Sequence, residues 1–423
     1  MKKINTSPIS GMQELLPAAQ ATFDRLKTTI SEVYHRHGFM SIETPVIDRT
    51  EILLAKAGGD TEKQIYKVIK TTESKDSADQ ALRFDHTVPL ARYVVEHEND
   101  LPFPFKVSQI GRNYRGERAQ KGRFREFYQC DVDVVGRGDL PLYYDADVIM
   151  TLLDAFQSFG LGTPVVARIN NRKILSGLIA ATNLESNAKD IYSIIDHSEK
   201  VPPEKTHAAL AEIGLGSERG AMLERFMEIH GSRAEVMQAL ANFNIANDLW
   251  SEGLAELDTT MSLLEDAGLS EQIRADMKIV RGLDYYTGTV FEFNLPEYPH
   301  VGSVCGGGRY DNLAGYFTDQ KLPGVGGSIG LTRLYYILST NGLLSDTITK
   351  PIDVAVVPIS AAELPYAIKV AAELRQSGTS ATLVTSDKKL GDKLKYASQI
   401  ALRAAVIGEN EVQTNHYEFK NFQ

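Results

Sequence analysis

Residues 105–136 contain two stretches of strand-like alternation around a cationic segment, and this pattern constrains the fold more than any other. The two predicted strands have the sequences "FKVSQIGRNYRGE" and "REFYQCDVDVVG". Residues 112–125 hold five arginines and one lysine against one glutamate, and Gly116 and Gly122 interrupt the run. The pattern predicts an antiparallel hairpin whose loop presents cations. A solvated charged face is the usual alternative for such a run.

Alternation along these strands predicts which side chains share a face. On the second strand, one mostly polar face holds Arg125, Phe127, Gln129, Asp131 and Asp133. The opposite face holds Tyr128, Cys130, Val132 and Val134. On the first strand, one side holds Asn113, Arg115 and Glu117. These faces could border one cavity, or they could be the solvated side of an antiparallel sheet.

Residues 81–87, "ALRFDHT", are predicted as a further strand. Arg83, Asp85 and Thr87 would share one face, and Leu82, Phe84 and His86 the other. A pocket bordered by these strands would contain two carboxylates, Asp85 and Asp133, and two cations, Arg115 and Arg281. Such a pocket suits a zwitterion with an extra basic group, together with a phosphate. No GxxxxGK[ST] loop occurs, so a nucleotide site of the P-loop kind is excluded. The run "VCGGGRYD" at 304–311 by itself predicts a tight turn.

The periodicity changes along the chain and predicts its organisation. Residues 19–37 have helical spacing, and "FMSIETPVI" is a strand that Pro45 interrupts. Helical periodicity runs from about 172 to 277, whereas 351–423 alternate strands and helices as in a small open α/β domain with some parallel strands. We therefore expect a strand-rich domain in two parts, 1–171 and 278–340, a helical insertion at 172–277, a linker at 341–350 and an α/β domain at 351–423.

Bulk composition excludes several classes of protein. No stretch approaches the roughly 18 apolar residues that span a bilayer, and the first residues lack a secretory signal. Cys130 and Cys305 are the two cysteines and form no CxxC pair, which indicates a reducing cytosol and argues against structural zinc. The formal net charge of −10 speaks against a general nucleic-acid-binding surface, so any such contact depends on local placement.

Five segments, in this order along the chain or close to it, resemble those of a known enzyme class. "GFMSIETPVIDRTEIL" resembles the first motif of class II aminoacyl-tRNA synthetases, which builds a dimer interface. "IGRNYRGERAQKGRFREFYQCDVDVVG" resembles their second motif, and "GVGGSIGLTRLYYIL" their third, which carries an ATP-binding arginine. "RGLDYYTGTVFEF" and "GGGRYD" resemble the two signatures of the histidyl-tRNA synthetase family within that class. The similarity covers nearly the whole chain.

This resemblance implies a fold and an activity. The fold would be an α+β catalytic domain on an antiparallel sheet, with an all-helical insertion and a C-terminal α/β anticodon-binding domain. The activity would be that of a histidine–tRNA ligase, which converts L-histidine and ATP with Mg²⁺ to histidyl-adenylate and pyrophosphate. Histidine would then be transferred to the 3′ end of tRNA(His). The resemblance also implies a cytoplasmic homodimer without a membrane segment or a protein-bound metal site.

The resemblance assigns roles to individual residues. Asp85 and Thr87 would hold the α-amino group of histidine, Gln129 its backbone, and Asp133 with Tyr286 its imidazole nitrogens. The full histidine-binding set would be Asp85, Thr87, Gln129, Asp133, Arg281, Tyr285, Tyr286 and Tyr310.

The nucleotide and tRNA contacts follow in the same way. The catalytic arginines would be Arg115 and Arg281, both on the α-phosphate, and Arg333 would meet the γ-phosphate. The ATP-binding set would be Arg115, Glu117, Arg123 and Arg333. The tRNA acceptor end would meet Arg118, Gln120 and Lys121. For the anticodon, the expected patch is Lys388, Lys389, Lys393 and Lys395, with a solvated helix face as the alternative.

Several positions depart from the family pattern. His86 stands where leucine is usual, and alternation points it away from the pocket as a packing residue. Gly327 and Thr332 replace an apolar and an acidic residue, and the latter change would weaken the support of Arg333. Asp133 replaces a glutamate of some members. The sequence ends at "HYEFKNFQ", earlier than the resemblance predicts, so a last strand or helix would be missing.

Two other functions compete with the ligase. One is a histidine-sensing regulatory paralogue that pairs with ATP phosphoribosyltransferase and does not aminoacylate. The other is a catalytically silent tRNA-binding module. Both would tolerate loss of the signature arginines and the first would lack the anticodon domain, whereas this chain keeps Arg115, Arg281 and Arg333.

Overall fold

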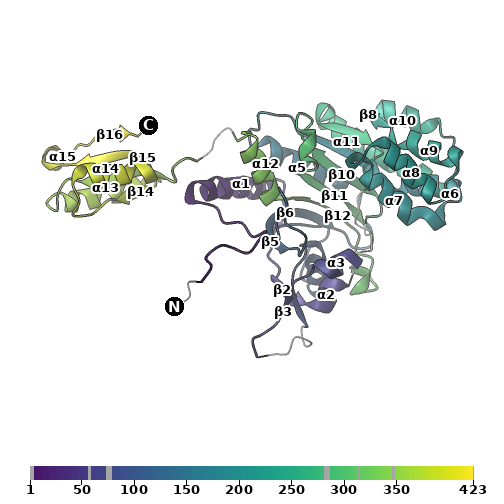
Figure 1. The fold of residues 1–423 in the computed structure, drawn as a ribbon, viewed down its shortest axis with the longest axis horizontal. Coiled ribbons are helices and arrows are strands. Elements are labelled where there is room, and N and C mark those ends of the chain that lie inside the picture. Colours follow the sequence, from purple (N-terminus) through teal and green to yellow (C-terminus); the bar gives the residue numbers. More distant parts are fainter. Residues whose placement is uncertain are drawn as a thin grey trace. The chain divides into compact units, whose positions relative to one another are not determined.

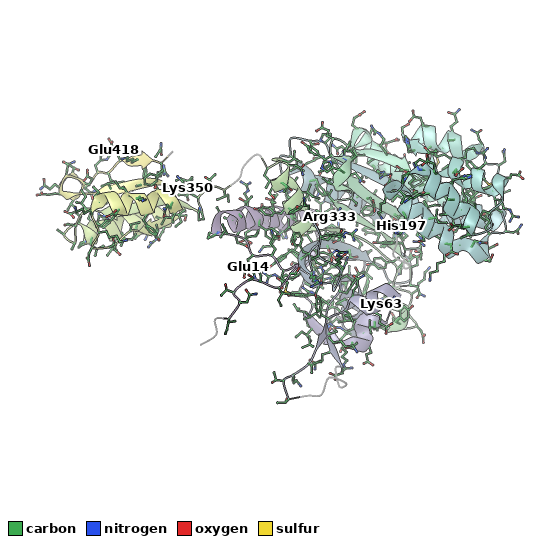
Figure 2. The ribbon with its side chains drawn as sticks, viewed as in Figure 1. Glu14, Lys63, His197, Arg333, Lys350 and Glu418 are labelled. Atoms are coloured by element: carbon green, nitrogen blue, oxygen red, sulfur yellow. The ribbon has the colours of Figure 1, made fainter. Side chains whose placement is uncertain are left out.

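The computed structural model describes residues 4–55, 59–72, 79–280, 286–312, 314–344 and 348–422. The chain divides into two compact units (Figure 1). The first comprises Met1–Gln13 and Lys27–Ser345, and the second Glu14–Leu26 and Asp346–Gln423, so both share residues of helix α1 (Pro17–Arg36). Figure 2 adds the side chains of each unit. No helix in the described part of the chain is long and apolar enough to cross a membrane.

A sheet of nine strands, counted over the described residues, forms the centre of the first unit. The strands, in their order across the sheet, are β1 (Met40–Ser41), β5 (Phe105–Tyr114), β6 (Glu126–Val135), β12 (Gly324–Ile329), β11 (Cys305–Tyr310), β10 (Thr289–Asn294), β7 (Val166–Asn171), β9 (Ile273–Asp276) and β8 (His230–Gly231). Neighbours are antiparallel except for the pairs β1–β5 and β7–β9. The predicted, mostly antiparallel sheet is therefore confirmed.

The predicted hairpin is the pair β5 and β6 near one edge of this sheet. Its register runs from Phe105 opposite Val135 to Tyr114 opposite Glu126. Val132 and Val134 are fully buried on the side of β6 that alternation predicted to be apolar. The two side-chain faces of β6 therefore differ in polarity from Gln129 to Val134.

Helices pack on the sheet and on one another. Helix α5 (Tyr143–Gln157) contacts β12 and α11 (Asp248–Asp266), and α11 contacts α6 (Arg172–Ala181). Gly327 allows this packing, because a Cβ there would lie 2.6 Å from Leu152 Cδ1 and 2.9 Å from Phe291 Cζ. The glycine at this position is thus needed for the close approach of α5 and β10 to β12.

The segment between β7 and β10 is mostly helical. Side-chain caps begin three of its helices, since Asn171 accepts from the backbone N–H of Lys173, Ser232 from that of Glu235 and Asn247 from that of Trp250. The strands β8 and β9 also lie here, too short to interrupt the helical periodicity of the sequence. The further helices, including short 3₁₀ turns, are η2 (Glu185–Asn187), α7 (Ala188–His197), η3 (Ser198–Lys200), α8 (Pro203–Glu212), α9 (Ser217–Met227), α10 (Arg233–Ala241) and η4 (Ser270–Gln272).

A small sheet, ordered β2-β4-β3, lies beside the hairpin. Its elements and neighbours are β2 (Ile47–Arg49), α2 (Thr50–Leu54), α3 (Gly59–Gln64), β3 (Lys67–Val68), β4 (Gln80–Leu82) and α4 (Thr87–Glu96). The remaining elements of the first unit are η5 (Pro299–Val301), η6 (Ala314–Tyr316) and α12 (Leu331–Thr340).

The strand predicted over residues 81–87 is wrong beyond Leu82, where β4 ends. The Asp85 carboxylate accepts the backbone N–H of Val88 at 3.1 Å and so begins helix α4 at Thr87. The guanidinium of Arg83 is buried and donates to the carbonyls of Thr44 and Arg112 at 2.6 and 2.9 Å. Arg83 therefore does not share a face with Asp85 and Thr87, because a helix cap replaces strand alternation here.

The second unit contains a four-stranded sheet, counted over its described residues. Its order is β14 (Ala381–Leu383), β13 (Ile352–Pro358), β15 (Ala401–Ile407) and β16 (Phe419–Asn421), parallel except for β15–β16. Its helices are α13 (Leu364–Gln376), α14 (Leu390–Ile400) and α15 (Glu409–Thr414). Strand β13 is apolar on both faces, since Val354 and Val356 pack in one core cluster and Ala355 and Val357 in another. The predicted α/β domain is confirmed.

Lys393 of α14 does not belong to an exposed basic patch. Its side chain is buried, and Nζ donates to the carbonyls of Pro358 at 3.0 Å and Ile359 at 3.3 Å. The prediction that it joins Lys388, Lys389 and Lys395 is wrong, because the chain needs a donor for the carbonyls at the end of β13.

We expect Lys393→Met to destabilise the second unit by about 1–3 kcal/mol, because two buried carbonyls lose their donor while the apolar stem is kept. Urea unfolding followed by far-ultraviolet circular dichroism measures the loss. The fluorescence of Trp250, the only tryptophan in the sequence, reports the first unit and should not shift. Lys395→Met, at an exposed position of the same helix, is the control. Equal effects of both variants would contradict the role of Lys393.

Candidate active site

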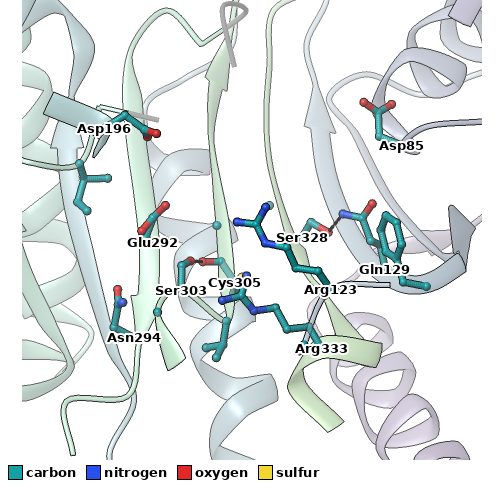
Figure 3. Close-up of a pocket in the computed structure, with 18 of the residues that line it drawn as sticks. Asp85, Arg123, Gln129, Asp196, Glu292, Asn294, Ser303, Cys305, Ser328 and Arg333 are labelled. Atoms are coloured by element: carbon teal, nitrogen blue, oxygen red, sulfur yellow. Dashed lines mark hydrogen bonds between the residues drawn. The ribbon is translucent and has the colours of Figure 1, made fainter. Parts of the chain in front are cut away.

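A cavity of about 1530 Å³ opens in the first unit over strands β6, β12, β11 and β10 (Figure 3). Side chains of α4, α12, the β5–β6 loop and the helical segment complete its lining. Because β6 contributes Phe127, Gln129, Asp131 and Asp133, the polar face of this strand is a cavity wall. The alternative of a solvated sheet face is thereby excluded.

Three carboxylates, Asp85, Asp131 and Asp133, form what we call the acidic floor of the cavity. Burial, together with the neighbouring Asp131 and Asp85, raises the pKa of Asp133 to about 8, against the opposing bond from Tyr310. Burial also raises the pKa of Asp85, although the bond from the Val88 N–H and the charge of Arg115 lower it. An acidic floor of this kind favours a ligand that brings positive charge or protons.

The carboxylate of Asp133 is held from two sides. Tyr310 Oη, at the end of β11, donates to Asp133 Oδ1 at 2.8 Å. Gly326 lies opposite Asp133 in the ladder, and a Cβ there would come within 1.9 Å of Oδ1.

The tight turn predicted from "VCGGGRYD" is wrong, because its glycines instead let a strand, β11, run closely between β10 and β12.

A hydrogen-bonded relay fixes the amide of Gln129. Gln129 Nε2 donates to Ser328 Oγ at 2.7 Å (Figure 3). Ser328 Oγ in turn donates to Asp131 Oδ1. Gln129 Oε1 accepts from Asn113 Nδ2 at 2.9 Å. Ser328 was not predicted as a site residue, although the polar residue in "GVGGSIG" was the available signal.

Arg115, just after β5, is fixed between two aromatic rings. Its guanidinium carbon lies 4.4 Å from the ring centroid of Phe84 and 5.1 Å from that of Phe127. Its Nε donates to the Phe84 carbonyl at 3.3 Å. Stacking and hydrogen bonding together hold the cation in the cavity lining, and Phe84 is a second residue that the sequence analysis did not assign to the site.

Two further arginines line the cavity from the β5–β6 loop and from α12. Arg123 pairs with Glu117 at 3.3 Å, and Arg333 Nη2 donates to the Val301 carbonyl at 2.7 Å. Both side chains extend into the cavity in Figure 3. Thr332 Oγ1 accepts the backbone N–H of Tyr128 at 2.8 Å, which ties the start of α12 to β6. Through this bond to β6, Thr332 supports the helix that carries Arg333.

Most predicted site residues meet in this cavity. The lining includes Asp85, Thr87, Arg115, Glu117, Arg123, Gln129, Asp133, Tyr286, Tyr310 and Arg333. Arg281 and Tyr285 lie outside the described residues. Arg118, Gln120 and Lys121 are exposed in the β5–β6 loop, outside the described cavity lining. Arg125, predicted on the same face as Gln129, instead donates to the carbonyls of Glu117 and Ser10, because β6 begins only at Glu126.

Two family models match the sequence. A histidyl-tRNA synthetase model matches residues 11–334, and an anticodon binding domain model matches residues 353–423. Among curated proteins, the chain is similar to a histidine–tRNA ligase of Clostridium tetani, with 42% identity over 427 residues, 100% of this chain and 96% of the relative. It is 39% identical to a histidine–tRNA ligase of Finegoldia magna over 99% of this chain and 96% of that relative.

Solved structures show the same architecture. The crystal structure of histidyl-tRNA synthetase from Nostoc sp. PCC 7120 matches with a TM-score of 0.88 and 36% identity, over 99% of this chain and 95% of that chain. A Bacillus halodurans protein, described as an ATP phosphoribosyltransferase regulatory subunit/histidyl-tRNA synthetase, matches with a TM-score of 0.78 over 96% and 100%. At 22% identity, the second likeness shows the fold alone.

Proposed function

The chain belongs to the histidyl-tRNA synthetase family and is a histidine–tRNA ligase, and from this premise we propose how its cavity binds histidine and ATP. The observation that carries the proposal is the arrangement of the acidic floor and the arginines in one cavity. The floor suits the amino group and imidazole of histidine, and the arginines suit a triphosphate.

Histidine binds over the acidic floor. Its α-amino group meets Asp85 and Thr87, and its backbone meets the amide of Gln129, which the Ser328 relay orients. Its imidazole meets Asp133, whose Oδ1 already accepts from Tyr310, so the second carboxyl oxygen is the one available to the ligand. Tyr286 borders the same part of the cavity.

ATP binds along the arginines. Arg115 holds the α-phosphate, and the two aromatic rings beside it keep its guanidinium in place. Arg333 holds the γ-phosphate, and Arg123 with Glu117 holds the rest of the nucleotide. Arg281, outside the described residues, is the second cation at the α-phosphate.

The reaction requires positioning and charge neutralisation from the chain. A carboxylate oxygen of histidine forms a bond to the α-phosphorus as the bond to pyrophosphate breaks. Negative charge grows on the α-phosphate oxygens in the transition state, where Arg115 and Arg281 stabilise it. A ribose hydroxyl at the tRNA 3′ end then attacks the acyl carbon, transfers its proton and displaces AMP. No side chain needs to form a covalent intermediate.

The ATP-binding residues would also hold the Mg²⁺ ion that accompanies the nucleotide. Among the described residues no group of three or more His, Cys, Asp and Glu side chains is placed to hold a metal ion. Mg²⁺ commonly binds through substrate phosphates with one or two carboxylates, and Glu117 is the carboxylate in the ATP-binding set. When bound, the ion neutralises charge on the departing pyrophosphate.

The proposal extends to the partners of the enzyme. The exposed loop residues Arg118, Gln120 and Lys121 meet the acceptor end of tRNA(His), and the second unit reads the anticodon. The segment that resembles the dimerisation motif, residues 38–53, supports a homodimer. The two cysteines are buried and form no disulfide, which accords with a reducing cytoplasmic location.

The regulatory paralogue is the weaker candidate. The curated relatives that match 99–100% of this chain are histidine–tRNA ligases, and residues 353–423 match an anticodon binding domain. Histidine-dependent ATP–pyrophosphate exchange by the purified chain, followed by aminoacylation of tRNA(His), tests the proposal. Histidine binding without exchange would favour the sensor.

We expect histidine affinity to be greatest between about pH 6.5, the usual pKa of the imidazole, and about pH 8, the pKa of Asp133. The bound imidazole and Asp133 share one proton in this scheme. Below the window both groups are protonated in the free state, so binding must release a proton; above it neither is, so binding must take one up. Titration calorimetry across pH 5.5–9.5, in buffers of different ionisation enthalpy, measures both limbs. A monotonic profile would contradict the shared proton.

A further inference from the structure

The turn Asp85-His86-Thr87 joins β4 to α4 and presents both residues proposed to hold the α-amino group. His86, between them, is only 1% exposed. Its Nδ1 lies 3.2 Å from Asp131 Oδ2, at ion-pair distance but without the alignment of a hydrogen bond. Neither ring nitrogen has a hydrogen-bond partner among the described residues, so the contact of Nδ1 with Asp131 is the ion-pair contact by which the ring meets β6.

Asp131 connects this ring to the centre of the cavity. Its other oxygen, Oδ1, accepts from Ser328, and Ser328 accepts from Gln129. Asp133, which is proposed to read the imidazole, lies two residues farther along the same strand and on the same face. His86 is therefore the side chain through which the turn contacts the strand that carries the rest of the histidine site.

The space for His86 is tightly shaped. A Cβ at position 111 of β5 would come within 3.1 Å of His86 Nε2, so the ring packs directly under this glycine. The backbone carbonyl of His86 accepts the N–H of Leu90 at 2.9 Å and lies 3.4 Å from Gln109 Nε2. With the ring and the backbone both held, the orientation of the turn depends on what the side chain at position 86 contacts.

We propose that His86 is a positioning residue for substrate selection, which through Asp131 fixes the spacing between the amino-binding pair and the imidazole-binding pair. The amino-binding pair is Asp85 and Thr87, and the imidazole-binding pair is Asp133 and Tyr286. This inference rests on the proposed function of the cavity. If His86 only filled space, replacing it with leucine would not change the selectivity between ligands with and without the amine. A change in this selectivity therefore tests the proposal.

The test compares three ligands on the purified full-length chain: histidine, histamine and 3-(imidazol-4-yl)propionate. The first two carry the α-amine, and the third has the imidazole and carboxylate without it. We expect His86→Leu to weaken histidine and histamine on the order of 10–100-fold and the propionate by less than about 3-fold, because the buried carboxylate of Asp131 loses a polar neighbour, and a buried polar group left without one has effects of this size. Inhibition of ATP–pyrophosphate exchange and titration calorimetry both give the constants.

Two variants sharpen the result. His86→Asn keeps an N–H donor near the position of Nδ1 and should recover most of the amine-dependent affinity. His37→Leu removes another His–Asp contact, 2.7 Å from Asp154 and outside the described cavity lining, and should change none of the three affinities. If His86→Leu does not fold, His86→Gln replaces it in the test. The longer side chain of glutamine places its amide beyond the position of Nδ1, so this variant should also weaken the two amine-bearing ligands.

The outcomes separate this inference from the function itself. A wild-type chain that binds neither histidine nor histamine would refute the proposed histidine site. A wild-type chain that binds both, with a His86→Leu variant that weakens all three ligands equally or none of them, would refute the positioning role alone. Loss of affinity confined to the two amine-bearing ligands supports it.

Discussion

Replacing Arg115 with alanine should reduce kcat/KM for histidine-dependent ATP–pyrophosphate exchange on the order of 10²–10³-fold, as loss of one charge-stabilising group in an enclosed site does. The guanidinium is stacked between Phe84 and Phe127 in the cavity lining, so its position is set before the substrate arrives. Because charge on the α-phosphate grows toward the transition state, kcat should fall more than the affinity for ATP.

Two controls separate chemistry from packing. Arg115→Lys keeps the charge but loses the planar fork and the stacking, so it should restore only part of the rate. Arg112→Ala removes an arginine of the same hairpin, whose guanidinium lies 5.0 Å from the Tyr128 ring and outside the described cavity lining. Arg112→Ala should leave exchange within about 3-fold of the wild type. A comparable loss in both alanine variants would mean that Arg115 acts through hairpin stability.

The hairpin could be predicted from the sequence because strand alternation carries its own geometry. Every second residue of β6 faces the cavity, so Gln129 and Asp133 were assigned to one wall before any contact was known. The same rule failed over residues 83–87, where a carboxylate cap at Asp85 starts a helix and turns Arg83 toward backbone carbonyls. A cap involves one side chain and one N–H, which leaves no periodic signal.

Contacts between distant parts of the chain could not be predicted from the sequence. Tyr310 and Asp133 are 177 residues apart in the sequence. They meet because the strand order leaves only β12 between β6 and β11. Lys393 illustrates the opposite error: the other lysines of the predicted patch are exposed, while Lys393 is buried and donates to the carbonyl of Pro358 at the end of β13. The identity of a charged residue does not reveal whether its partner is solvent, a ligand or the backbone.

Replacing Asp133 with leucine should raise the dissociation constant for histidine on the order of 10²–10³-fold, because the imidazole and Tyr310 both lose a partner in a buried site. The affinity for ATP should stay unchanged, since the arginines and not Asp133 are proposed to hold the nucleotide. The exchange assay, titrated with histidine and separately with ATP, measures both constants.

Asp133→Asn distinguishes the shared proton from a simple negative charge. Its amide can accept from Tyr310 and donate to an unprotonated imidazole nitrogen, as the protonated carboxyl would. We therefore expect a smaller loss of histidine affinity than in Asp133→Leu. The affinity of the asparagine variant should not decline as the pH rises through about 8, because the variant lacks the carboxyl with that pKa. If the asparagine variant were as weak as the leucine variant at every pH, Asp133 would act as a fixed anion.

Folding stability gives an independent check on the same group. Because the folded-state pKa of Asp133, about 8, lies above the ordinary carboxyl value of 3.8, the native state binds the extra proton between these limits. The stabilisation is complete below about pH 3.8 and is lost as the pH rises through 8. Asp133→Asn removes this dependence, so the wild type should lose urea resistance relative to the variant from about pH 4 to 8. A constant difference between them would place the carboxyl in an environment that leaves its pKa near 3.8, and the shared-proton scheme for histidine would fail with it.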